Sequence, residues 1–269
     1  MKRIFSLVAM VALLLVSIAS PISAAGHPAA HDPLLRKMGF TDEQLALLTP
    51  QAKEAIVARV GGRGKLVGFD HKVSSFPSEG PSPGQPSTQL ISQDQLSLAM
   101  AVVQDQYPPA GQIRFYVVSS WKWLIKPFYT LEDKIGIAWD GPFEALQSSL
   151  GSVYTIKLTN GTYQTFTQTV PSDQTPGAGF GFTVDLLNAY GSFGVEEHSG
   201  YIEGYIYKYQ ANNPYPGWHT GTAVTKYFHK QGSVTGSLSF SKQGPSIAIT
   251  PSTSYDESGQ PGDNYDWYE

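Results

Sequence analysis

The chain has 269 residues, of which 41% are hydrophobic and 12% aromatic, so it can bury a sizeable core and is not an intrinsically disordered chain. Its formal net charge of -4 and its scattered lysines and arginines argue against nucleic acid or an anionic membrane surface as a partner. It contains no cysteine, which excludes disulfide bonds, thiol catalysis and thiolate metal sites.

Residues 1–25 have the features of a secretory signal peptide. Lys2 and Arg3 precede an apolar run over residues 4–18, and small residues follow at 21–25. The apolar run is shorter than the roughly 20 residues that a membrane-spanning helix needs. The sequence therefore predicts a secreted, extracellular protein without stable insertion in a membrane.

The border of the signal peptide contains one candidate metal residue, His27. Cleavage after Ala24 would leave Ala25, Gly26 and His27 at the new amino terminus, where one amine, two amides and an imidazole can surround Cu(II) or Ni(II) in a plane. Cleavage after Ala25 fits the signal better, because the small residue Ser23 then stands in the favoured position before the cut. No cofactor is predicted.

Residues 26–73 are predicted to be a short helical N-terminal segment. Thr41 and Gln44 form a capping box that opens one helix, and Thr49 with Pro50 opens a second. Gly61 ends the second helix. Helices this short are marginal alone, so the segment either packs on the following domain or is a removed pro-segment.

Residues 74–90 are rich in Ser, Pro, Gly and Gln and are predicted to be a disordered linker. Ser92 and Gln95 then form another capping box before an apolar stripe. We expect one helix from about 92 to 106 that covers the domain.

The stretch over residues 113–139 alternates with the period of a β-strand. One phase is apolar and is expected to be buried: Ile113, Phe115, Val117, Trp121, Trp123 and Ile125, then Ile135, Ile137 and Trp139. The two halves are predicted to form the central hairpin of a sheet, with the three tryptophans in one core.

Further short strands follow. Asn160-Gly161 predicts a hairpin with a type I′ turn that pairs Leu158 with Tyr163. Other alternating runs lie at 180–186, 201–209, 222–228, 234–240 and 246–249. The fold class predicted is all-β, an antiparallel β-sandwich over residues 91–251, followed by a solvated acidic tail at 252–269.

The sequence contains neither the H-E-x-x-H motif of zinc hydrolases nor the G-x-x-x-x-G-K phosphate loop of nucleotide-binding proteins. A glycoside hydrolase needs only two carboxylates about 5 to 10 Å apart, which no spacing in the sequence excludes. The weak catalytic candidates are Glu196, Glu197, His198 and Glu203. An ordinary polar strand end explains the same residues.

Aromatic residues are the stronger functional signal. Tyr205, Tyr207 and Tyr209 share one strand phase, and Tyr215 and Trp218 follow in a loop rich in Pro and Gly. Such a face can bind sugar rings or lie inside the sandwich. The sequence favours a secreted non-catalytic binding or structural protein, with an extracellular polysaccharide or envelope polymer as ligand. The alternatives are a secreted glycan-acting hydrolase that uses a carboxylate pair and a membrane-damaging β protein.

Overall fold

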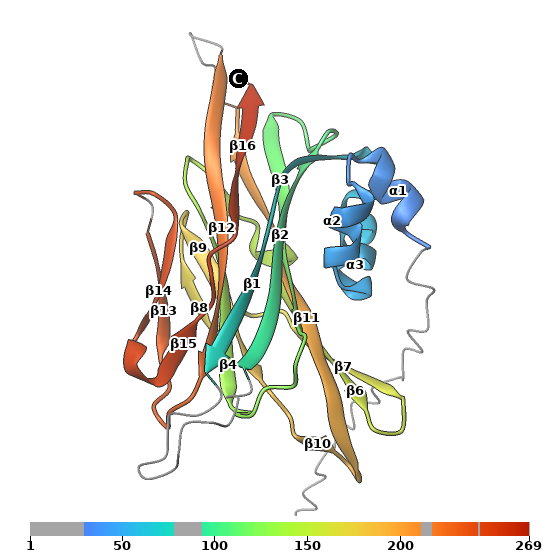
Figure 1. The fold of residues 1–269 in the computed structure, drawn as a ribbon. Helices are drawn as coiled ribbons and strands as arrows, with labels where there is room; N and C mark the ends of the chain where they lie inside the picture. The colour runs from blue at the N-terminus through green and yellow to red at the C-terminus, as the bar shows by residue number, and fades with distance from the viewer. Residues whose placement is uncertain (1–29, 78–92, 211–216, 242, 269) are drawn as a thin grey trace, which may run out of the picture.

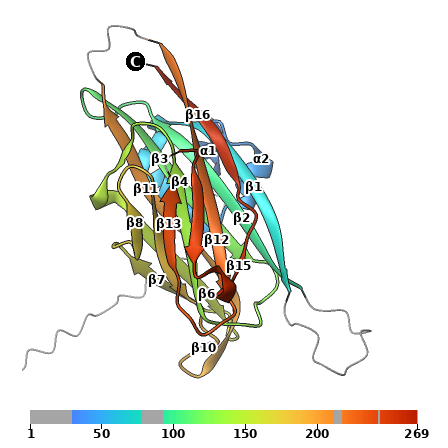
Figure 2. The ribbon, with the colours of Figure 1, turned by 90° about the vertical axis from the view of Figure 1, so that its left-hand side faces the viewer.

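The protein is built from two antiparallel β-sheets packed face to face, with three short helices on the outside of the larger sheet (Figure 1). The computed structural model describes residues 30–77, 93–210, 217–241 and 243–268. The predicted signal peptide, His27, Tyr215 and residues 78–92 lie outside the described residues. Seen from the side in Figure 2, the strands of both sheets run along one long axis, as in aligned sandwiches. The all-β sandwich prediction is confirmed.

The larger sheet has eight strands, with β1, β2, β3, β11, β6 and β7 side by side and β5 and β10 beside β11. Its strands are β1 (Gly64–Pro77), β2 (Gln93–Asp105), β3 (Gln112–Trp123), β5 (Glu144–Ala145), β6 (Gly151–Leu158), β7 (Tyr163–Gln168), β10 (Ala189–Tyr190) and β11 (Phe193–Tyr209).

The smaller sheet has six strands, with β15, β12, β4, β9 and β8 side by side and β16 paired with β12. Its strands are β4 (Glu132–Trp139), β8 (Asp173–Thr175), β9 (Gly179–Asp185), β12 (Trp218–Lys230), β15 (Tyr255–Glu257) and β16 (Gly262–Tyr268). Short 3₁₀ turns lie at η1 (Gly61–Arg63), η2 (Gln147–Ser149) and η3 (Ser252–Ser254).

A separate hairpin of β13 (Ser237–Ser241) and β14 (Ser246–Thr250) covers the outer face of the smaller sheet. Its Leu238 and Phe240 pack directly on two glycines of β9. A Cβ atom on Gly179 would lie 2.3 Å from Phe240, and one on Gly181 would lie 2.4 Å from Leu238. Only glycine allows the hairpin to approach the sheet this closely.

The core between the sheets contains all three predicted tryptophans, Trp121, Trp123 and Trp139, so their common core is confirmed. The predicted hairpin of residues 113–139 is wrong, because β3 and β4 lie in different sheets. Ile125 is 44% exposed, since β3 ends at Trp123. Alternation identified one buried phase of β3, but Tyr116 and Val118 of the other phase are also buried, and alternation does not show which strand lies alongside.

The predicted covering helix over 92–106 is also wrong, because residues 93–105 form β2 between β1 and β3. Leu98 and Met100 face the core between the sheets, while Ala99 and Ala101 face the helices. A strand buried on both faces gives a continuous apolar run, and periodicity cannot distinguish that run from a buried helix.

The helical segment has the predicted caps and one additional helix. Its helices are α1 (Asp32–Lys37), α2 (Asp42–Leu47) and α3 (Pro50–Val60). The Thr41 hydroxyl accepts from Gln44 N, Thr49 caps α3, and Gly61 ends it with a positive φ of 56°. The helices form a second core with the outer face of the larger sheet. Residues 64–73, predicted as part of this segment, belong to β1.

Two other boundaries differ from the predictions. Residues 74–77 of the predicted linker continue β1, and Phe76 is buried. The predicted solvated tail forms β15 and β16, and its Tyr265 and Trp267 are only 1% and 4% exposed. Aromatic residues alternate with Asn264 and Asp266, so β16 buries its apolar side and leaves the polar side in water.

The β6–β7 hairpin forms where Asn160-Gly161 predicted it, but with another turn. Gly161 has a φ of 80°, and no residue other than glycine has a positive φ in the described chain. Gly161 N donates to Leu158 O, and Leu158 N donates to Thr162 O. This is a three-residue loop with a glycine bulge, and it shifts the register so that Tyr163 faces Lys157 instead of Leu158.

Candidate functional site: a groove with an aromatic wall

The two sheets meet along β1 and β16, and the groove opens where this contact ends. Phe69 N donates to Asp263 Oδ2, and Gly262 N donates to Asp70 Oδ2, both at 2.9 Å. Gly68 lies so close to β16 that a Cβ atom there would be 3.1 Å from Asn264 O. β1 has a bulge between Leu66 and Gly68, and Leu66 N donates to Met38 O in the helical segment. The end of β1 is therefore held away from β16.

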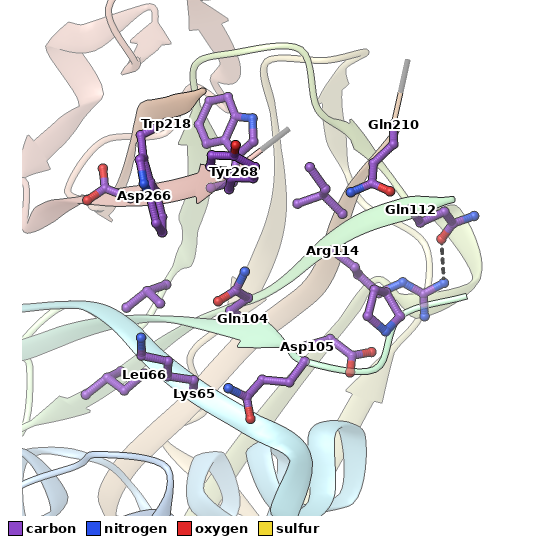
Figure 3. Close-up of a pocket in the computed structure, with 15 residues that line it drawn as sticks. Lys65, Leu66, Gln104, Asp105, Gln112, Arg114, Gln210, Trp218, Asp266 and Tyr268 are labelled. Atoms are coloured by element: carbon purple, nitrogen blue, oxygen red, sulfur yellow. Dashed lines mark hydrogen bonds between the residues drawn. The ribbon is translucent and has the colours of Figure 1, made fainter. Parts of the chain in front are cut away.

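The space between these strand ends is a groove of about 670 Å³ (Figure 3). Trp218 and Tyr268 stand on one side of it, while Gln112, Arg114 and Gln210 stand across from them. Gln104 lies between the two sides, and Lys65 lies below it in this view, beside Leu66. The groove is lined by side chains from five strands, β1, β2, β3, β12 and β16.

The aromatic wall follows from the pairing of β12 with β16. Trp218 and Tyr268 are directly opposite each other, with ring centroids 5.6 Å apart and an edge-to-face angle of 68°. The next pair along the strands, His219 and Trp267, is turned to the other face, where Trp267 is buried. Trp218 and Tyr268 are therefore left in water, 77% and 53% exposed.

The polar side of the groove is rich in amides, contributed by Gln104, Gln106, Gln112 and Gln210. Each amide can both donate and accept a hydrogen bond. The Gln112 carbonyl accepts from Arg114 Nη2 at 3.0 Å. The buried carboxylate of Asp105 accepts from Tyr107 N at 3.1 Å. The groove thus contains positively and negatively charged side chains, together with neutral amides that can form hydrogen bonds with hydroxyl groups of a ligand.

The predicted tyrosine face is only partly accessible. Tyr205 is 7% exposed, because α3 covers it and its hydroxyl donates to Arg59 O at 2.7 Å. Burial raises the pKa of the Tyr205 hydroxyl. Tyr207 is half-buried and Tyr209 is 66% exposed on the same outer face, with ring centroids 5.7 Å apart. As an exposed ligand residue, Tyr205 was wrongly predicted.

Trp218, in contrast, lies on the groove, where it pairs with Tyr268. Tyr268 was not predicted as a ligand-binding residue, because residues 252–269 were interpreted as a solvated tail. The signal that could have found it is the alternation of polar and aromatic residues through Asn264, Tyr265, Asp266 and Trp267.

The four catalytic candidates do not share a cleft. Glu203 is buried beneath α3, where its carboxylate pairs with Arg59 Nη2 at 2.7 Å and accepts from the Tyr116 hydroxyl. This pairing anchors the helices to the sheet. His198 is fully buried on the other face of β11, among the side chains between the sheets.

The other two candidates form an ion-pair network near the start of β11. Glu197 pairs with Lys122 and Lys157, each at 3.0 Å, and Glu196 lies 3.6 Å from Lys157. Partial burial acts to raise the pKa of Glu197, but the two lysines outweigh it and lower that pKa. A carboxylate held ionised by two lysines is a poor proton donor for glycoside hydrolysis.

His198 should make the fold sensitive to acid. Tyr154 accepts from Leu187 N at 3.1 Å, and its hydroxyl forms a hydrogen bond with His198 Nδ1, 2.8 Å away. His198 Nε2 has no hydrogen-bond partner within the described part of the chain. Burial, together with the charge of Lys126, lowers the pKa of His198 from 6.5 to about 4.

Between these pH values the unfolded chain binds more protons at His198 than the folded chain. We therefore expect the free energy of unfolding to fall by up to about 3 kcal/mol as the pH drops from about 6.5 to about 4. In His198→Asn the side-chain amide can still form a hydrogen bond with Tyr154, but it does not titrate. The free energy of unfolding of this variant should therefore fall less over the same pH range. Urea unfolding at both pH values measures the difference, and equal losses in the two proteins would contradict the assignment.

Within the described residues no group of three His, Asp or Glu side chains is placed to hold a metal ion. No helix in the described ranges is long and apolar enough to cross a membrane. No protein-family model matches the sequence, and no curated protein matches it either, so this groove and its residues carry the functional argument.

Proposed function

We propose that the protein is exported and that the groove binds an extracellular polysaccharide or envelope glycan without catalysing its cleavage. The observation that carries the proposal is the pair of exposed aromatic rings, Trp218 and Tyr268, on the wall of an open groove. The signal peptide predicted from the sequence supplies the compartment.

The aromatic pair is hard to explain without a ligand. The other two tryptophans of the smaller sheet, Trp139 and Trp267, are buried, as apolar residues of this size usually are. Keeping a tryptophan and a tyrosine side by side in water leaves apolar area that a ligand can cover. Sugar rings have apolar C–H faces that fit flat against an aromatic ring.

The rest of the groove suits the polar rim of a sugar. Hydroxyl groups donate and accept hydrogen bonds, and so do the amides of Gln104, Gln106 and Gln210. A few convergent polar groups beside an apolar surface are typical of small-molecule sites. The groove volume of about 670 Å³ has room for several sugar units.

Affinity electrophoresis in gels that contain soluble polysaccharides tests the proposal. We expect the parent protein to be retarded by at least one neutral glycan, and Trp218→Ala and Tyr268→Ala each to weaken binding about tenfold or more, since aromatic anchors contribute about 2 kcal/mol. Tyr209→Ala is the matched control, because it removes another exposed ring from outside the groove lining.

The result can fail in two distinct ways. If no glycan of a broad panel retards the parent protein, the proposed ligand class is wrong. If Tyr209→Ala abolishes retardation while Trp218→Ala does not, the binding face is the outer surface at Tyr207 and Tyr209, and the groove is not the site.

A further inference from the structure

Strand β7 presents a free edge of the larger sheet. It is the last strand in the order of that sheet and pairs only with β6 among the residues that the structure describes. Four of its six residues are exposed, and so are the following residues 169 and 170. The opposite edge of the same sheet, β1, is covered by β16. An open edge offers unpaired backbone groups to another strand.

The hairpin geometry shows which backbone groups point outward. Leu158 N donates to Thr162 O, and Tyr163 then faces Lys157. Hydrogen-bonded and non-hydrogen-bonded pairs alternate along an antiparallel ladder. The backbone groups of Gln164 and Phe166 therefore point to β6, and those of Tyr163, Thr165 and Thr167 point away from it.

The composition of this edge indicates what can pair with it. Residues 163–172 contain no charged side chain, and β7 contains no proline, so two of the usual devices that block edge pairing are missing. In a symmetric antiparallel pair the residue on the two-fold axis meets its own copy, so a charge at that position would face a like charge. An uncharged strand avoids that repulsion.

We propose that two copies of the chain pair antiparallel through β7 and so join their larger sheets. A two-fold axis at Thr165 places Thr165 opposite its own copy and Tyr163 opposite Thr167 of the second copy. All three outward-facing residues then contribute both backbone groups to the new ladder. Phe166 stays against Tyr154 and Tyr190 within its own chain, so the pairing requires no repacking there.

The oligomeric state of the full mature protein tests this pairing. Light scattering after size exclusion, over a series of protein concentrations, should show the mass of the parent rising from one chain to two. Thr167→Pro removes an outward N–H and leaves the ladder with β6 intact, so it should stay monomeric at every concentration. Thr167→Ala keeps the N–H and should dimerise like the parent.

Thr165→Lys gives a second, independent readout, because it places two lysines opposite each other at the axis and should lose the dimer. Circular dichroism and thermal unfolding check that each variant is folded. The proposal is overturned if the parent stays monomeric at all concentrations, or if Thr165→Lys and folded Thr167→Pro dimerise like the parent. If the monomeric parent instead binds extended peptides at this edge, the partner is another protein.

Discussion

Ile56→Ala is expected to lower the free energy of unfolding by about 2 to 5 kcal/mol. Ile56 is fully buried where α3 packs on the outer face of the larger sheet, so its removal leaves a cavity in the second core. Val57→Ala is the matched control on the next position of α3. Val57 is only partly buried, so its loss should cost clearly less. Urea unfolding followed by tryptophan fluorescence measures both.

The same contacts predict the outcome of removing residues 30–63. The helices cover Ala101, Tyr116, Val118 and Tyr205, all of which would be left in water on one face of the sheet. The deletion would also leave the buried carboxylate of Glu203 without Arg59. We expect such a chain to be insoluble or unfolded. A soluble deletion variant with the parent's melting temperature would show that the segment is dispensable, as a removable pro-segment has to be.

Trp121→Ala is expected to cost about 3 to 5 kcal/mol, which is a large part of the stability of a domain of this size. The Trp121 ring is 1% exposed and lies 5.9 Å from the ring of Tyr154 and 5.4 Å from that of Tyr227. It links aromatic side chains from both sheets. Trp121 is among the largest fully buried side chains of the described chain, so its replacement leaves a large cavity in the sandwich.

Trp218→Ala is the matched control, because it removes the same side chain from a site that is 77% exposed. Its free energy of unfolding should stay within about 0.5 kcal/mol of the parent. The two variants should thus separate stability from binding. Trp121→Ala should unfold at a lower urea concentration than the parent, whereas Trp218→Ala should lose only its binding to the glycan. An equal loss of stability in both would contradict the groove as a solvent-exposed site.

Features that depend on neighbouring residues were predicted correctly from the sequence. The caps at Thr41 and Thr49 depend on side chains that bond to backbone groups only a few residues away, and they form as predicted. The buried phase of β3 depends only on alternation, so Trp121 and Trp123 were placed correctly. The class of fold follows from the same alternation repeated along the chain.

The binding candidates needed the fold. Tyr205 and Tyr209 have the same strand phase, but α3 covers the first and leaves the second in water. Trp218 and Tyr268 are about fifty residues apart and become neighbours only through the register of β12 and β16. No local pattern records which strand lies beside which.

The sequence by itself determined the helix caps, the period of several strands and the burial of Trp121, Trp123 and Trp139, because these depend on residues within one or two turns or along one strand. The tertiary structure decided that residues 93–105 are a strand, that the supposed tail completes the smaller sheet, and where the groove opens. Each of these depends on pairing between segments distant in the chain, and that pairing is set by the burial of both faces and by the bulge in β1.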